Sequence, residues 1–85
     1  MRVLIPSALH SYTGKAWVEA TGDTVGAVLL DLDRQYAGIR FRMIDEQNRM
    51  RSNMRFFVGG AATFDLAQPL KPSDTLHILQ ALSGG

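Results

Sequence analysis

Cysteine is absent from this 85-residue chain, which excludes disulfides, iron–sulfur clusters, thiolate zinc sites and a cysteine nucleophile. A large excess of either charge is also absent. The formal charge is +1, so no overall attraction to nucleic acid or to a membrane is expected. No hydrophobic run is long enough to cross a bilayer. The opening MRVLIPSALH has no apolar stretch of signal-peptide length, and a cytoplasmic protein is therefore expected.

Familiar catalytic patterns are missing as well. His10 and His77 are not placed at metal-ligand spacing, and the eight carboxylates are scattered along the chain. Asp31 and Asp33 lie two positions apart in a predicted helix and so fall on different faces. Neither of the glycine-rich phosphate-binding patterns, GxGxxG and GxxxxGK, occurs. We therefore expect no metal site, no bound cofactor and no enzymatic activity of the chain's own.

The residues that are present describe an ordinary globular domain with one small core, since 46% are hydrophobic and 20% are charged. Residues 2–5 (RVLI) are short, branched and apolar and predict a first strand, and residues 15–20 (KAWVEA) predict a second. Residues 7–14 are expected to form a loop between them. Because this loop ends in turn residues, the two strands are expected to pair antiparallel.

One helix is clearly predicted, because apolar residues recur at i, i+3, i+4, i+7 and i+11 after a polar cap. Thr24 or Asp23 can cap its first turn, and Gly38 is a natural left-handed stop. The residues of the apolar stripe are Val25, Val28, Leu29, Leu32 and Tyr36.

The second half of the chain is less regular. Residues 39–53 fit a strand or a helical turn equally well, with a turn at residues 45–48. Residues 54–58 predict a strand that ends in a tight turn at Gly59 and Gly60, and residues 75–79 predict the last strand. Strands on either side of one helix favour an α+β fold, in which a mixed sheet has one main helix packed across one face.

Strict alternation assigns a face to each strand residue. The residues expected to face the helix are Val3, Ile5, Val18, Ala20, Met54, Phe56, Val58, Leu76 and Ile78. Leu4, Trp17, Phe57, His77 and Leu79 then fall on the uncovered face. Large apolar groups on an open face indicate a docking surface, and the alternative is that the loop of residues 7–14 buries one or two of them.

Arginine is concentrated between positions 34 and 55, which hold six of the nine basic residues, opposed there only by Asp45 and Glu46. Such a cluster can bind nucleic acid or can be a solvated face that keeps the protein soluble. Because exposed aromatic residues are not interleaved with it, we expect no nucleic-acid partner. A protein partner is the favoured functional use. The six are Arg34, Arg40, Arg42, Arg49, Arg51 and Arg55.

The chain ends in ALSGG, residues 81–85, and two terminal glycines arise by chance in about 1 in 200 sequences at the average glycine frequency of ~7%. Residues 80–85 can extend about 20 Å, and a Gly-Gly end is thin enough to enter a narrow channel. A carboxylate is inert until another protein activates it. We therefore expect a domain at residues 1–80 and a flexible tail at residues 81–85 that serves as a substrate or carrier.

The order of these elements, with RFFVGG, LKPSDTLHILQALSGG and GDTVGAVLLDLDRQYAGI among them, resembles the MoaD/ThiS family of ubiquitin-like β-grasp sulfur carriers over essentially the whole chain. The segment IPSALHSYTG looks closer to the cysteine-biosynthesis carrier and to MoaD-like proteins than to the thiamine carrier. The resemblance implies a ubiquitin-like β-grasp fold. It also implies that the chain is not an enzyme and is acted on by partner enzymes.

The same resemblance implies a mechanism. An E1-like enzyme that uses ATP and Mg would adenylate Gly85, and sulfur would replace the adenylate to leave a thiocarboxylate. A sulfur-accepting biosynthetic enzyme, for cysteine, molybdopterin or a related product, would then receive the sulfur. Leu82, Ser83 and Gly84 would line the channel of the partner, and Leu4, Phe57 and Leu79 would dock it. Two alternatives remain open: a ubiquitin-like modifier joined to targets through its terminal glycine, and a non-covalent β-grasp interaction module.

Overall fold

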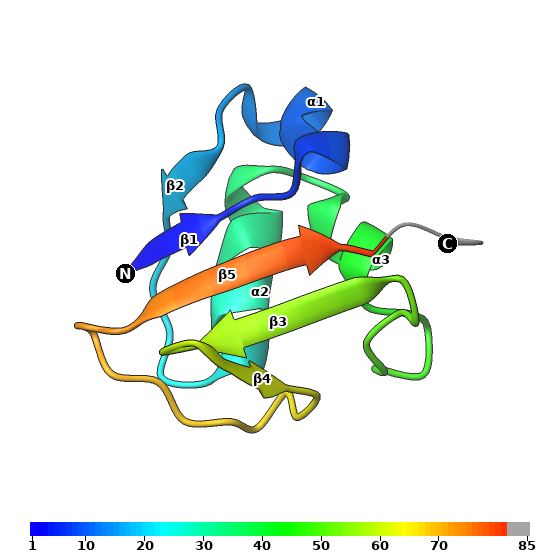
Figure 1. The fold of residues 1–85 in the computed structure, drawn as a ribbon. Helices are drawn as coiled ribbons and strands as arrows, with labels where there is room; N and C mark the ends of the chain where they lie inside the picture. The colour runs from blue at the N-terminus through cyan, green and yellow to red at the C-terminus, as the bar shows by residue number, and fades with distance from the viewer. Residues whose placement is uncertain (82–85) are drawn as a thin grey trace.

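The computed structural model describes residues 1–81. A single mixed sheet has the strand order β2-β1-β5-β3-β4, in which β1 and β5 run parallel and every other neighbouring pair is antiparallel (Figure 1). The predicted antiparallel pairing of the first two strands is confirmed. The strands are β1 (Arg2–Leu4), β2 (Trp17–Glu19), β3 (Met54–Val58), β4 (Ala61–Thr63) and β5 (Thr75–Gln80).

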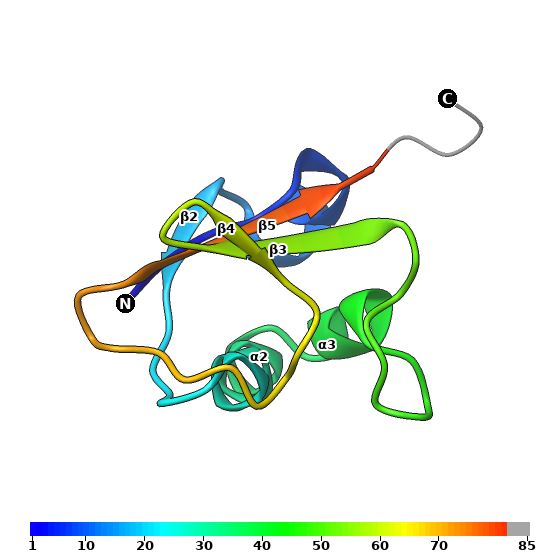
Figure 2. The same cartoon turned by 60° about the horizontal axis from the view of Figure 1, so that its bottom comes forward.

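The main helix, α2 (Val25–Gln35), crosses one face of the sheet, as predicted (Figure 2). Its first turn is capped by Thr24, whose side-chain oxygen accepts a hydrogen bond from the backbone N–H of Ala27 at 3.1 Å. Gly38 has a φ of +94° and is left-handed, as predicted, but α2 has already ended at its cap Tyr36, and Gly38 is the N-terminal cap of a second helix, α3 (Ile39–Met43). Asp33 accepts backbone hydrogen bonds from Gly38 and Arg40, which ties the two helices together.

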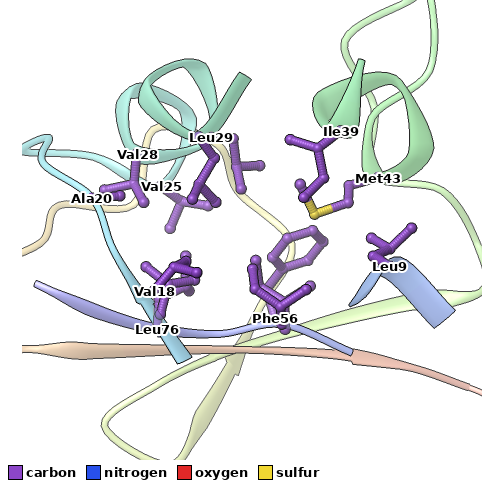
Figure 3. Close-up of a cluster of buried hydrophobic side chains, with 14 of the residues drawn as sticks. Leu9, Val18, Ala20, Val25, Val28, Leu29, Ile39, Met43, Phe56 and Leu76 are labelled. Carbon is purple, nitrogen blue, oxygen red and sulfur yellow. The ribbon is translucent and has the colours of Figure 1, made fainter. Parts of the chain in front are cut away.

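The core lies between the helices and the covered face of the sheet (Figure 3). Eight of the nine strand residues predicted to face the helix are buried, and Val58, near the turn into β4, is half-buried. The helix contributes its apolar stripe, of which Val25, Val28, Leu29 and Leu32 are fully buried. Removing each such side chain from water stabilises the fold by about 1.5–3 kcal/mol before conformational entropy is counted. The arrangement is the α+β β-grasp fold that the sequence predicts.

The predicted loop at residues 7–14 is wrong, because this segment is helical. It forms a 3-10 turn, η1 (Ser7–Leu9), followed by the single turn α1 (His10–Thr13). Leu9 is buried in the core, and a ring nitrogen of His10 lies 2.9 Å from the carbonyl oxygen of Ile5. Tertiary contacts therefore form a helix that is too short to be stable alone.

The open choice at residues 39–53 is decided in favour of a helical turn, because α3 buries Ile39 and Met43 on its inner side. The predicted turn at residues 45–48 is confirmed: Asn48 donates its N–H to the carbonyl oxygen of Asp45 at 3.1 Å. Backbone N–H groups of Arg49 and Gln47 donate to the Asp45 carboxylate, and these bonds hold the pKa of Asp45 below its usual value.

A short strand that sequence patterning does not predict, β4, completes the sheet. It pairs with β3 through the predicted turn, in which Gly59 and Gly60 have φ values of +57° and +83°. Two consecutive left-handed residues are the geometry of a type I′ hairpin, which glycine adopts without steric cost. Three residues, two of them alanine, carry too weak an alternation to predict β4 from sequence.

Candidate functional site

The open face of the sheet carries one line of side chains that runs across all five strands. Backbone pairing places Trp17 beside Leu4, Leu4 beside His77, His77 beside Phe57, and Phe57 beside Ala62. None of these side chains is fully buried, so the helical segment at residues 7–14 does not remove this face from solvent. The predicted open face is therefore confirmed as a structural feature.

Trp17, at the β2 end of this line, is held from two sides. The guanidinium carbon of Arg2 lies 4.2 Å from the centroid of a Trp17 ring, and the His77 ring meets Trp17 edge-on, with centroids 5.6 Å apart. At the other end of the face Leu79, which pairs with Arg55 on β3, remains 43% exposed. An apolar centre flanked by cations can contact an apolar partner surface that has an acidic rim.

The last described residue leaves the sheet at a fixed point. The backbone N–H of Ala81 donates to the carbonyl oxygen of Asn53 at 2.7 Å, one residue after β5 ends. The residues predicted to enter a partner's channel, Leu82, Ser83, Gly84 and Gly85, lie outside the described residues. What the structure gives is therefore the surface from which that segment starts.

This surface is hollowed by a pocket of about 540 Å³. Figure 1 shows two of the elements that line it, α1 and α3, on the same side of the molecule as the C-terminal end of β5. We call it the tail-root pocket. Its walls come from η1, α1, α3, the segment after Met50 and the end of β5. The lining residues are Ala8, Leu9, Ser11, Tyr12, Phe41, Arg42, Arg51, Asn53 and Gln80.

Two arginines of the tail-root pocket are oriented by hydrogen bonds. Arg42 donates its Nε–H to the hydroxyl oxygen of Tyr12 at 2.9 Å, a contact that raises the pKa of Arg42 further and keeps it charged. Arg51 donates its Nε–H to the carbonyl oxygen of Phe41 at 2.7 Å and stacks on the Phe41 ring, 4.6 Å from its centroid. Sequence reasoning missed this pocket because its walls are far apart in the chain. The arginine cluster was the one signal for it.

Asp31 and Arg34 have structural roles. Asp31 accepts hydrogen bonds from the backbone N–H of Thr21 and the side-chain amide of Gln35, both at 3.0 Å, and pairs with Arg34. The Thr21 bond in particular holds the pKa of Asp31 below its usual value, against the opposing effect of partial burial.

Two further observations concern the described part of the chain alone. Residues 1–81 contain no group of three or more histidine or carboxylate side chains placed to hold a metal ion. No helix within the same residues is long and apolar enough to cross a membrane.

No family model matches the chain. Comparison of its sequence with curated proteins and of its structure with solved structures both give relatives named CysO. The sulfur carrier protein CysO of Mycobacterium tuberculosis is 36% identical, and the match covers 98% of this chain and 96% of CysO. In the solved complex of BexX and CysO from Amycolatopsis orientalis, the matching chain is 33% identical, with a TM-score of 0.89, over 99% of this chain and 98% of that one.

A third relative belongs to a differently named group. The small archaeal modifier protein 1 of Methanosarcina acetivorans is 25% identical, with a TM-score of 0.80, and the match covers 99% of this chain and 94% of that protein. The fold is thus shared between proteins named for sulfur carriage and proteins named for modification.

Proposed function

The chain belongs to the CysO family of sulfur carrier proteins, and from this premise we propose that Gly85 is the residue on which the sulfur is carried. The observation that carries the proposal is the full-length relationship to a sulfur carrier, combined with an ALSGG end that starts from a fixed point at Asn53. A glycine carboxylate at the end of a thin segment is suited to enter the active site of another protein. The chain is then a substrate of its partners.

The chemistry requires activation, because hydrosulfide does not displace oxygen from a free carboxylate. In the first step a carboxylate oxygen of Gly85 attacks the α-phosphate of ATP, and pyrophosphate leaves. In the second step hydrosulfide, free or released from a sulfur donor, attacks the acyl carbon, and AMP leaves with the oxygen. The product is a thiocarboxylate that can give its sulfur to a biosynthetic enzyme. An E1-like partner supplies the nucleotide site and its Mg, and this chain supplies the acyl group.

The partner enzymes dock on the open face, where Leu4, Phe57 and Leu79 supply the apolar contact. Leu82, Ser83 and Gly84 pass through the channel that leads to the partner's nucleotide site. CysO of Amycolatopsis orientalis is known in a complex with BexX, which supports the expectation that a carrier of this family binds a protein partner directly. Because the activation consumes ATP, the cytoplasm is the proposed location.

Intact-protein mass spectrometry tests this function. The chain is incubated with an extract of its host cell, ATP and a sulfide source, beside a matched chain that lacks Gly84 and Gly85. We expect a mass gain equal to one oxygen-for-sulfur exchange in the full chain and no gain in the shortened one. A shortened chain that gains the same mass would show that the sulfur is attached elsewhere. A full chain that never gains this mass would contradict the proposed role as a sulfur carrier.

A second candidate function is favoured by the likeness to the archaeal modifier protein, which extends over nearly the whole chain. In that case the activated Gly85 would form an isopeptide bond with a lysine of a target protein. The same incubation separates the two outcomes. ATP-dependent conjugates of high mass, without the oxygen-for-sulfur exchange, would favour the modifier.

A further inference from the structure

The tail-root pocket has an unbalanced charge. Two guanidinium groups, of Arg42 and Arg51, line it, and the described residues of its lining include no carboxylate. Asp45, outside that lining, is close enough to Arg51 for the arginine to contribute to its lowered pKa, but does not form an ion pair with it. Within residues 1–81 the ion pairs join the N-terminal amine to Glu19 and Arg34 to Asp31. Neither pocket arginine therefore has a carboxylate within ion-pair distance in the described part of the chain.

The two guanidinium groups are also oriented before any partner arrives. Each donates its Nε–H to a protein oxygen, on Tyr12 and Phe41 respectively, and the described residues offer no acceptor to its terminal amino groups. A guanidinium fixed through Nε presents its remaining N–H donors in a planar fork that matches a carboxylate. Because the stack of Arg51 on Phe41 already restricts that side chain, less conformational entropy is lost on binding.

The pocket lies where the terminal segment begins. Gln80 lines it, and Asn53, another lining residue, holds the backbone of Ala81. Four extended residues span at most about 14 Å, so a partner whose active site holds Gly85 must place the entrance of its channel within that distance of Ala81. Because Asn53 both lines the pocket and holds the backbone of Ala81, the tail-root pocket lies beside the point from which this segment starts.

We propose that the tail-root pocket binds an acidic side chain of the partner protein at the entrance of the channel that receives residues 82–85. This proposal rests on the proposed function and extends it, because it assigns recognition to a second surface beside the open face of the sheet. The contact would align the chain at the point where it enters the channel. Pairing with a partner carboxylate also matches the charge that the pocket leaves unbalanced.

A protein carboxylate fits the pocket better than the phosphates of a nucleic acid. Phosphate-backbone binding requires a run of cations along a surface, and the net charge of the chain is only +1. Three of the six arginines are engaged by the chain itself. Arg34 pairs with Asp31, Arg40 donates to the side-chain oxygen of Asn48 at 3.2 Å, and Arg55 donates to the carbonyl oxygens of Ser52 and Met54.

The first test compares the initial rate of thiocarboxylate formation in the host extract for three chains: wild type, R42Q/R51Q, and a control that loses the same charge elsewhere, K15Q/K71Q. We expect the pocket variant to be about tenfold slower at low salt and the control to change less than about twofold. Raising the ionic strength to about 0.3 M should narrow the gap, since salt screens exposed charges. R42K/R51K keeps the charge but not the planar fork, and should recover the rate only in part.

A second test does not require the partner and separates this inference from the proposed function. The isolated chain is titrated with a hexaglutamate peptide, and separately with inorganic phosphate, while the arginine Nε–H signals are followed by NMR. We expect the peptide to shift the signals of Arg42 and Arg51 and to leave those of Arg2 and Arg55 unchanged. The R42Q/R51Q spectrum also shows whether that variant is folded.

Three results would overturn the proposal: equal slowing of the pocket variant and the control, peptide shifts spread over all the arginines, or tighter binding of phosphate than of peptide. The two proposals can also fail separately. If the wild-type chain acquires no sulfur but the peptide still binds at Arg42 and Arg51, the proposed function is contradicted and the carboxylate-binding site is supported.

Discussion

The two faces of the five-stranded sheet carry side chains of similar size but differ in what covers them. On β3 the neighbours Phe56 and Phe57 point to opposite sides: Phe56 is 1% exposed beneath the helices, whereas Phe57 lies half-buried on the open face. On β5 the same contrast separates Ile78 from Leu79. Neighbouring residues of one strand have the same backbone geometry and similar strand propensity, although their side chains lie on opposite faces. The covering of each face therefore determines the role of its side chains.

This difference separates stability from recognition. Apolar area that is already buried contributes to the free energy of folding, whereas area still exposed contributes when a partner removes it from water. The covered face should therefore determine the unfolding free energy, and the open face should determine affinity for partners. The first two of the following predictions test that separation, the third concerns a polar contact of the helix that covers the sheet, and the largest effect is given first.

Replacing Phe56 with alanine should destabilise the fold by about 3–5 kcal/mol, because the substitution leaves a cavity in a closed core. Chemical denaturation followed by circular dichroism measures the change. A loss below about 1 kcal/mol would mean that the core relaxes into the cavity. Burial of Phe56 beneath α2 would then not explain its contribution to the free energy of unfolding.

Replacing Phe57 with alanine should cost no more than about 1.5 kcal/mol of stability, because the side chain is only partly removed from water. The rate of thiocarboxylate formation at limiting partner should nevertheless fall about tenfold or more, as expected for an aromatic anchor of an interface. A rate equal to that of the wild type would contradict the proposal that partner enzymes dock on this face.

A smaller effect should appear on acidification. The pKa of Asp31 is lower in the folded state than its ordinary value of 3.8, so the unfolded chain binds more protons in this range. The stability that the Thr21 and Gln35 hydrogen bonds provide is fully present when the pH is above 3.8, the ordinary pKa. It is lost as the pH falls below 3.8 and through the lower pKa of the folded state. Thermal unfolding of wild type and Asp31→Asn between about pH 5 and 2 should show a flatter dependence for the variant. Parallel curves would contradict this role.

Much of the fold follows from patterns that are short in range. The stripe from Val25 to Leu32 predicts α2 and its covered side, and the alternation through Phe56, Phe57 and Val58 predicts which residues face it. Each of these patterns lies within a single element. The core follows them because the apolar side chains of the helix stripe all pack against the same sheet. Val58 departs from its predicted burial since it lies next to the turn at Gly59.

The remainder depends on contacts between distant residues. The helical turn at His10 is supported by contacts to Ile5 and to the core, and its single turn carries no helical period of its own. The tail-root pocket likewise requires Tyr12 to meet Arg42, thirty positions away, and such a pairing has no signature in local spacing. The open-face residues Leu4, Phe57 and Leu79 were predictable because they needed only the alternation of one sheet.

The parallel pairing of β1 with β5 has a consequence for how the protein is made. The first strand of the chain lies beside the last, and β5 sits in the middle of the sheet between β1 and β3. A nascent chain that has reached only Asp74 lacks β5, the strand that joins the β1–β2 pair to the β3–β4 pair. The pairing of β1 with β5, which lie far apart in the chain, therefore cannot form until β5 has left the ribosome, and the sheet stays divided until then.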